Sequence, residues 1–101
     1  MATIPLKYCE QIKEALRYVD EYKLRNVKVY IDWTELSNER YYDICHYDTL
    51  IARLYPSSNV VCLFGGYSAS DRDIINSFIE LYGLSGKVHK KGDSLYYNID
   101  E

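Results

Sequence analysis

A group of acidic side chains at the end of a predicted strand is the strongest candidate in the sequence for a chemically active site. Residues 27–33 alternate apolar and polar side chains as a strand does, and Asp32 lies near the end of this segment. Glu35, Glu39 and Asp43 come soon after it. Carboxylates gathered at a strand end are ligands that Mg²⁺ and Mn²⁺ accept, so this is the first candidate for metal-dependent chemistry.

A glycine pair, Gly65-Gly66, separates an apolar strand at residues 59–64 from a predicted helix. α/β proteins often bind a phosphate at such a position. The sequence has neither GxGxxG nor GxxxxGK[ST], however, and Asp71 and Asp73 in the first helical turn would repel an anion. Turn and capping geometry is therefore the favoured interpretation, and an anion site is the alternative.

The histidines and cysteines show no catalytic or metal-binding spacing. His46 and His89 are far apart and have no Cys/His or Ser/His/Asp context, so we expect no nucleophilic catalysis. Cys9, Cys45 and Cys62 form no CxxC pair, which favours buried free thiols in a reducing cytosol. We predict no catalytic residues, no metal and no cofactor.

The stretch from residue 30 to residue 48 combines charge with aromatic rings. It holds five carboxylates against one arginine, and it interleaves four tyrosines and a tryptophan. Carboxylates steer encounters with a basic surface, and these rings supply contact area at low entropic cost. The alternative, a solvated helix face with core tyrosines, stays open. The predicted partner-binding residues are Asp32, Trp33, Glu35, Glu39, Tyr41, Tyr42, Asp43 and Tyr47.

Hydrophobic spacing predicts three helices, at residues 5–22, 38–55 and 71–82, with strands at 27–33 and 59–64 and a hairpin at 86–99. A break at Asp48-Thr49, which would divide the second helix into two shorter ones, is the alternative. Ser70 and Asp73 predict the start of the third helix, and Gly83 its end. The order α-β-α-β-α-β-β, with right-handed crossovers, predicts an α/β fold with a mixed, mostly parallel sheet and a C-terminal hairpin. An irregular α+β arrangement is the alternative.

The length predicts one domain, residues 1–101, and the cysteine pattern predicts that it resides in the cytoplasm. No apolar run is long enough to span a membrane, and the N-terminus has no secretory pattern. A net charge of −3 argues against direct nucleic-acid binding and against an anionic membrane surface. The basic end of the hairpin favours edge protection, with single-strand nucleic-acid contact as the alternative; its residues are Lys87, His89, Lys90 and Lys91, with Tyr96 and Tyr97 nearby. Homodimerisation through the hairpin edge is left open.

Residues 27–91 resemble the first half of a NYN/PIN-like ribonuclease domain. The resemblance is carried by Val29-Tyr30-Ile31-Asp32-Trp33-Thr34-Glu35-Leu36, the helix predicted after it, and the strand at residues 61–65. It implies a metal-binding aspartate at Asp32. Thr34 and Glu35 stand where the family usually has asparagine, and the later acidic strand ends have no counterpart, so the resemblance implies an inactive remnant rather than an enzyme.

The leading hypothesis is a non-catalytic protein-binding module: a small cytosolic inhibitor whose acidic, tyrosine-rich face blocks a basic, nucleic-acid-binding site. The expected partner is a larger protein or nucleoprotein complex. In size and composition the chain is similar to phage-encoded inhibitors of host defence, including anti-CRISPR proteins, which would place it in the host cytoplasm. The alternatives are the NYN/PIN-like ribonuclease or its remnant, and an immunity protein or antitoxin.

Overall fold

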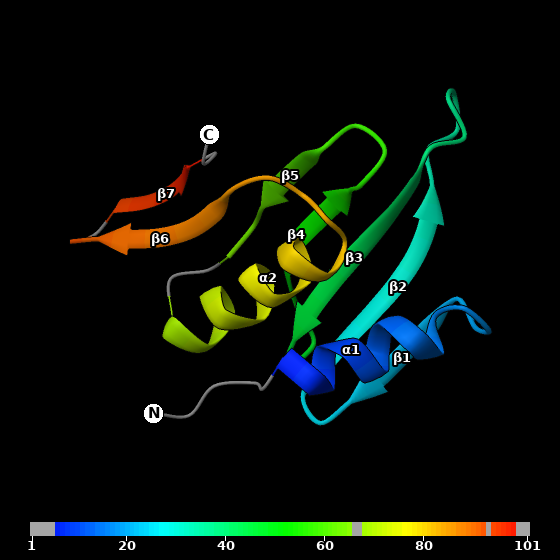
Figure 1. The fold of residues 1–101 in the computed structure, drawn as a ribbon, viewed down its shortest axis with the longest axis horizontal. Coiled ribbons are helices and arrows are strands. Elements are labelled where there is room, and N and C mark those ends of the chain that lie inside the picture. The colour runs from blue at the N-terminus through cyan, green and yellow to red at the C-terminus, as the bar shows by residue number, and fades with distance from the viewer. Residues whose placement is uncertain (1–5, 66–67, 93, 99–101) are drawn as a thin grey trace.

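An antiparallel five-stranded sheet, covered on one face by two helices, forms most of the molecule (Figure 1). The computed structural model describes residues 6–65, 68–92 and 94–98. The strands follow one another in space as in sequence; they are β1 (Glu21–Leu24), β2 (Val27–Trp33), β3 (Arg40–His46), β4 (Thr49–Tyr55) and β5 (Val60–Leu63). Helix α1 (Leu6–Ala15) precedes the sheet and α2 (Ala69–Leu81) follows it. β6 (Lys87–Lys91) and β7 (Ser94–Asn98) pair with each other in a separate hairpin.

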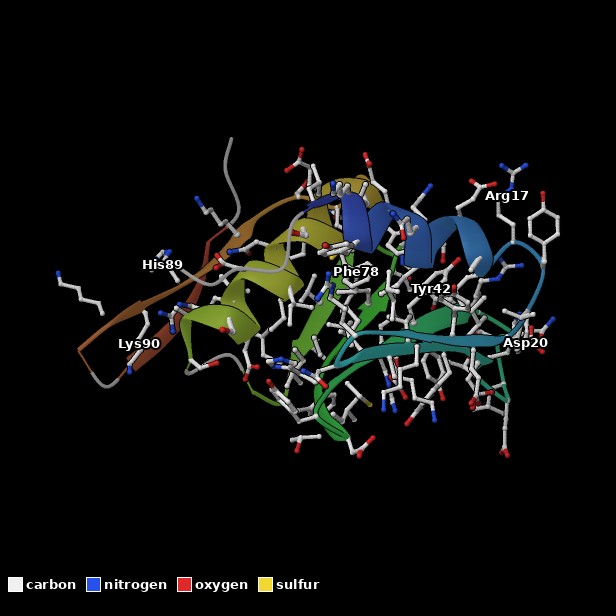
Figure 2. All side chains as sticks on the ribbon, turned by 90° about the horizontal axis from the view of Figure 1, so that it is seen from below. Arg17, Asp20, Tyr42, Phe78, His89 and Lys90 are labelled. Carbon is white, nitrogen blue, oxygen red and sulfur yellow. The ribbon has the colours of Figure 1, made fainter. Side chains whose placement is uncertain are left out.

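The strand predicted at residues 27–33 is confirmed, and its alternation positions the core. Val27, Val29 and Ile31 are buried on the face under the helices, while Lys28 and Tyr30 lie on the other face. The helices supply the other side of this core: α1 and the residue after it contribute Cys9, Ile12 and Leu16, and α2 contributes Ile74, Ile75, Phe78 and Ile79. Figure 2 shows the helices and the sheet as two layers, with Phe78 and Tyr42 between them.

The helix predicted at residues 38–55 is wrong, because this segment forms the β3–β4 hairpin. Tyr47 and Asp48 both have positive φ, 52° and 65°, as the two central residues of a tight hairpin turn require. The register shifts between Ile44 and Cys45, so that Ile51 and Ala52 are both buried although they are adjacent. This irregularity breaks the two-residue period of the strand and produces the spacing that looked helical.

The mostly parallel sheet is also wrong. Residues 60–63 form β5 at the edge of an antiparallel sheet instead of a strand buried on both faces, and Val60 is 42% exposed. The alternative of an irregular α+β arrangement is closer to the observed order, in which five successive strands lie between the two helices.

The boundaries of the helices differ from the prediction. α1 ends at Ala15, and Tyr22 belongs to β1. α2 is capped by Ser68, whose hydroxyl accepts a hydrogen bond from the Asp71 amide, so Ser70 is not the cap. The prediction of Gly83 as the C-terminal glycine is confirmed by its φ of 70°.

Two polar contacts join α2 to the strands. The Asn76 side chain forms hydrogen bonds with both the N–H and the C=O of Val88, which holds β6 against the helix. At the other end of α2, His46 Nδ1 lies 2.6 Å from Asp71 Oδ1. His46 therefore has a structural partner. Within the described part of the chain, neither helix is both long and apolar enough to cross a membrane.

Candidate functional site

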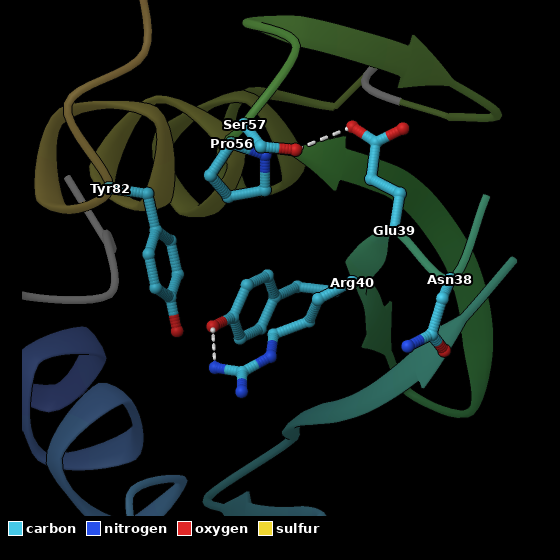
Figure 3. Close-up of a pocket in the computed structure, with 7 residues that line it drawn as sticks. Asn38, Glu39, Arg40, Pro56, Ser57 and Tyr82 are labelled. Carbon is cyan, nitrogen blue, oxygen red and sulfur yellow. Dashed lines mark hydrogen bonds between the residues drawn. The ribbon is translucent and has the colours of Figure 1, made fainter.

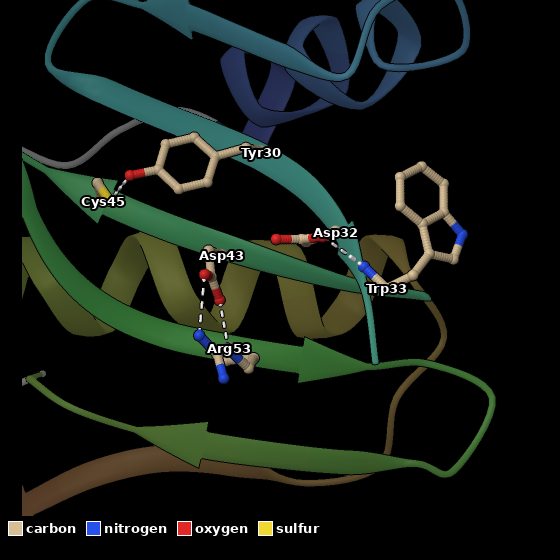
Figure 4. A network of polar contacts seen from close by, with 6 residues as sticks. All are labelled: Tyr30, Asp32, Trp33, Asp43, Cys45 and Arg53. Atoms are coloured by element: carbon tan, nitrogen blue, oxygen red, sulfur yellow. Dashed lines mark hydrogen bonds and ion pairs between the residues drawn. The ribbon is translucent and has the colours of Figure 1, made fainter. Parts of the chain in front are cut away.

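The sheet face opposite the helices, called the open face below, carries a row of aromatic and charged side chains (Figure 4). Neither of the two helices in the described residues lies on it (Figure 2). Strand register places these residues there: Glu21, Lys23, Lys28, Tyr30, Asp32, Tyr41, Asp43, Cys45, Leu50, Arg53, Tyr55, Val60, Cys62 and Phe64.

A bidentate ion pair between Arg53 and Asp43 lies at the centre of the open face. Arg53 Nε and Nη2 donate to the two carboxylate oxygens of Asp43 at 2.6 and 3.1 Å. The guanidinium carbon also lies 4.3 Å from the ring centroid of Tyr41 and 5.9 Å from that of Phe64. Hydrogen bonding to Asp43 raises the pKa of Arg53 above its already high ordinary value, so the guanidinium stays charged. Asp43 is only 8% exposed despite its position on the open face.

A second set of contacts lies beside this pair, over β2. The Tyr30 hydroxyl and Cys45 Sγ are 3.5 Å apart, and the hydrogen bond between them, together with the nearby thiol, raises the pKa of Tyr30 to about 12. Lys28 Nζ lies 5.1 Å from the Tyr30 ring centroid and 3.3 Å from a Glu21 carboxylate oxygen. The rings of the open face are thus held in place by neighbouring charges and by one another, without a covering layer.

The β2–β3 loop, residues 34–39, extends beyond one end of the sheet (Figure 1). Its backbone is closed by two hydrogen bonds, from the Thr34 amide to the Glu39 carbonyl and from the Asn38 amide to the Thr34 carbonyl. The Thr34 hydroxyl accepts from the Glu39 amide at 2.9 Å and lies 2.6 Å from the Ser37 hydroxyl. These contacts fix the backbone of the loop and so reduce the entropic cost of ordering it on binding.

Exposed apolar and acidic side chains meet on this loop. Leu36 is 102% exposed and Trp33, just before the loop, is 39% exposed. Asp32 and Glu35 are exposed as well. Glu39 accepts hydrogen bonds from Ser58 and Ser57, and these lower the pKa of its carboxyl and tie the loop to the β4–β5 turn. We call residues 32–41 the hairpin end; within it, three carboxylates face one arginine.

The structure brings together most of the residues predicted to bind a partner, although the helix expected to present them does not exist. Asp32 pairs with Tyr41 across β2 and β3, and Trp33 pairs with Arg40. Five of the predicted partner-binding residues therefore lie in the hairpin end: Asp32, Trp33, Glu35, Glu39 and Tyr41. Asp43 lies farther along the open face, in its ion pair with Arg53.

Two predicted residues lie elsewhere. Tyr42 is on the covered face, 8% exposed, and its ring stacks on Tyr82 with centroids 4.4 Å apart. Tyr47 is 67% exposed but belongs to the β3–β4 turn, at the opposite end of β3 from the loop. Adjacent strand residues point to opposite faces of a sheet. Tyr41 and Tyr42 therefore cannot share the single binding face that was predicted from a helix.

Sequence reasoning missed Leu36, Arg53, Tyr55 and Phe64. The signal for Arg53 and Tyr55 was present, because these residues alternate with Ala52 and Leu54 as in a strand. Tyr55 lies against Tyr41, with ring centroids 5.3 Å apart. Because this segment was predicted to be a helix, the position of Arg53 and Tyr55 on one face of a strand was not recognised.

Asp32, the aspartate on which the ribonuclease resemblance depends, accepts a hydrogen bond from the Trp33 amide at 2.8 Å. The residue is followed by the β3–β4 hairpin instead of a helix, so the strand–helix–strand order of that resemblance is absent. Across residues 6–65, 68–92 and 94–98, no three His, Cys, Asp or Glu side chains are grouped as a metal ion would require. All three cysteines are free. Gly66, the second glycine of the predicted anion loop, lies outside the described residues.

Comparison of the chain with protein-family models, with curated proteins and with solved structures found no match.

Proposed function

We propose that the protein is a non-catalytic binding module, a small inhibitor that inserts its hairpin end into a basic site of a larger protein. The observation that carries this proposal is the combination at residues 32–41 of a fully exposed Leu36, a neighbouring Trp33 and three carboxylates on a hydrogen-bonded loop. Tryptophan is among the residues most often found as an anchor of protein interfaces. Leu36 lies on a loop that projects from the sheet and Trp33 lies at its base, so both are placed to enter a groove (Figure 1).

Charge selects the kind of partner. The hairpin end has a net charge of −2, from Asp32, Glu35 and Glu39 against Arg40. Such a surface accelerates encounter with a basic site and disfavours nucleic acid itself. Sites that bind nucleic acid are positively charged, and a projecting acidic hairpin would compete with the nucleic acid for such a site.

The neighbouring strip of the open face would extend the contact. Tyr41 and Tyr55 continue from the hairpin end toward the Asp43–Arg53 pair. Tyrosine loses little conformational freedom on binding, and these rings are already packed against one another. An immunity protein or antitoxin would use the same surface, and the identity of the partner distinguishes these functions from an inhibitor of host defence.

The test is a comparative capture from cells in which the protein is naturally made. Immobilised wild type, the double variant Trp33→Ala/Leu36→Ser and the charge reversal Glu35→Lys are compared by quantitative mass spectrometry. Tyr18→Ser and Glu10→Lys, at exposed positions of the α1 region, are the matched controls. We expect one protein with a basic surface to be retained by wild type and both controls and lost with both hairpin variants.

The captured protein is then purified and titrated with the inhibitor at increasing salt. The proposal requires an affinity that falls with salt and a loss of about tenfold or more for the anchor variant. Capture of the same proteins by all five forms would contradict it, and so would an affinity for the purified partner that Glu35→Lys leaves unchanged.

A further inference from the structure

Three basic side chains and two tyrosine rings meet where the end of α1, the start of β3 and the end of α2 come together. A hollow of about 120 Å³ lies there, lined by Lys13, Leu16, Arg17, Arg40, Tyr42 and Tyr82. A larger hollow of about 410 Å³ shares Arg40, Tyr42 and Tyr82 with it (Figure 3). The remainder of the larger hollow is formed by Asn38, Glu39, Pro56 and Ser57.

The positive charges of the small hollow are only weakly neutralised. Neither Lys13 nor Arg40 is within ion-pair distance of a carboxylate in the described part of the chain. Arg40 Nη1 donates to the Tyr42 hydroxyl at 3.4 Å, and Lys13 Nζ lies 5.6 Å from the Tyr82 ring centroid. Arg17 does pair with Glu14 at 3.3 Å, but both side chains are more than half exposed, so this pair is weak.

Two further carboxylates lie in the surroundings of the hollow. The negative charge of Asp20 raises the pKa of Arg40 from a distance, and it contributes less than the Tyr42 hydrogen bond does. Glu39 lines the larger hollow, but its carboxylate is turned to Ser57 and Ser58, as Figure 3 shows for Ser57. The small hollow thus keeps an excess of positive charge.

The Tyr82 hydroxyl is the one buried side-chain polar atom in the described residues that has no hydrogen-bond partner. Figure 3 shows its ring directed toward the end of the Arg40 side chain. Burial raises the pKa of this phenol, so the group is a neutral donor at physiological pH. A buried hydroxyl without a partner costs free energy that a ligand acceptor would recover.

We propose that the small hollow binds the phosphoryl group of a small phosphomonoester, with the rest of the ligand in the larger hollow. A phosphomonoester carries nearly two negative charges and three acceptor oxygens, which suit the guanidinium forks of Arg17 and Arg40 and the ammonium of Lys13. A carboxylate has one charge and two oxygens and would leave more of this positive charge uncompensated. The long side chains that rim the hollow can shift to let a ligand oxygen reach the Tyr82 hydroxyl. This site borders the proposed hairpin interface: it shares Asn38, Glu39 and Arg40 with the hairpin end, whereas Lys13, Arg17 and Tyr82 lie outside it.

The test is a titration of the purified protein with phenyl phosphate, followed by amide chemical shifts at constant ionic strength. Inorganic phosphate probes the small hollow alone, benzoate supplies a carboxylate on the same ring, and phenol supplies the ring without an anion. We expect phenyl phosphate to bind more tightly than either phosphate or benzoate, with shifts at residues lining both hollows. Arg40→Gln should weaken the binding by about tenfold or more, because it removes a charge-assisted contact.

Tyr82→Phe separates ligand binding from a structural role. Because the hydroxyl has no partner in the free protein, its removal should leave the midpoint of thermal unfolding unchanged or raised, while phenyl phosphate affinity falls about threefold to tenfold. Lys23→Gln, an exposed lysine on the open face, is the matched charge control and should bind as wild type does. Equal binding by wild type and Arg40→Gln, equal losses in Lys23→Gln, or tighter binding of benzoate would each overturn the proposal.

Discussion

The covered and the open faces of the central strands are built differently, although their residues alternate along the same sequence. On the covered face, Val29, Ile44 and Leu54 have no exposed surface, and α1 and α2 pack over the face. On the open face, Tyr30 and Tyr41 lie beside cations and other rings and are only half-buried. Burial of apolar surface stabilises the fold through the first face, whereas stacking and ion pairing keep the second face ordered and accessible.

The Asp43–Arg53 pair shows how this difference arises. It lies at the centre of the open face, and the Tyr41 ring packs against its guanidinium. A charged pair in that position gives a surface that is ordered without becoming a second core. The comparison of the faces can be tested by removing groups from each.

Of two polar contacts that can be removed, the larger effect is expected at Arg53. Arg53→Ala leaves the Asp43 carboxylate, 8% exposed, without its cation, and we expect a loss of about 1–3 kcal/mol in the free energy of unfolding. The double variant Asp43→Ala/Arg53→Ala should lose less than the single variant. Urea unfolding measures both, with Lys28→Ala as control for the loss of a half-buried cation. Equal losses in Arg53→Ala and Lys28→Ala would show that the pair has no structural role.

A smaller effect is expected at the start of α2, the helix that covers the core face. Ser68→Ala removes the hydroxyl that accepts from the Asp71 amide and should cost about 1 kcal/mol. Ser70→Ala, two residues later and inside the helix, should change the stability by less than about half of that amount. The same unfolding measurement decides the point, and the reverse order of the two losses would place the cap at Ser70.

A further test concerns pH, and it compares a thiol of the core with the rest of the molecule. Burial raises the pKa of Cys9 from 9.0 to about 11, although a hydrogen bond from Ser77 acts the other way. The stability that this protonated thiol supports is complete below pH 9 and is lost as the pH rises toward 11, because the unfolded chain ionises first. Between pH of about 8 and about 10.5, wild type should lose more stability than Cys9→Ala. Parallel pH profiles of the two proteins would contradict this.

The sequence predicted elements with strong local signals. Ile74, Ile75, Phe78 and Ile79 specified the buried stripe of α2, and the strand at residues 27–33 followed from its alternation. Gly92, with a φ of 62°, lies at the turn of the last hairpin as expected. These features depend on residues close in sequence, and the later packing does not override them.

The β3–β4 hairpin could not be predicted in the same way. The register shift at Ile44 gave the apolar residues a nearly helical spacing, and the turn was made by Tyr47 and Asp48 without a glycine. The parallel topology then failed, since it required a crossover helix that is absent. The acidic and aromatic residues at 32–41 were identified correctly as near neighbours, but their assignment to faces depended on a secondary structure that was wrong.

The most direct test of the account compares two neighbouring tyrosines of β3, because the open and the covered face differ there by a single position. Tyr42→Ala removes a ring stacked in the core and should lower the free energy of unfolding by about 3–5 kcal/mol. Tyr41→Ala removes a ring from the open face and should cost about 1 kcal/mol. A greater loss for Tyr41→Ala than for Tyr42→Ala would mean that the strand faces the other way, and both the open face and the binding surface built on it would be refuted.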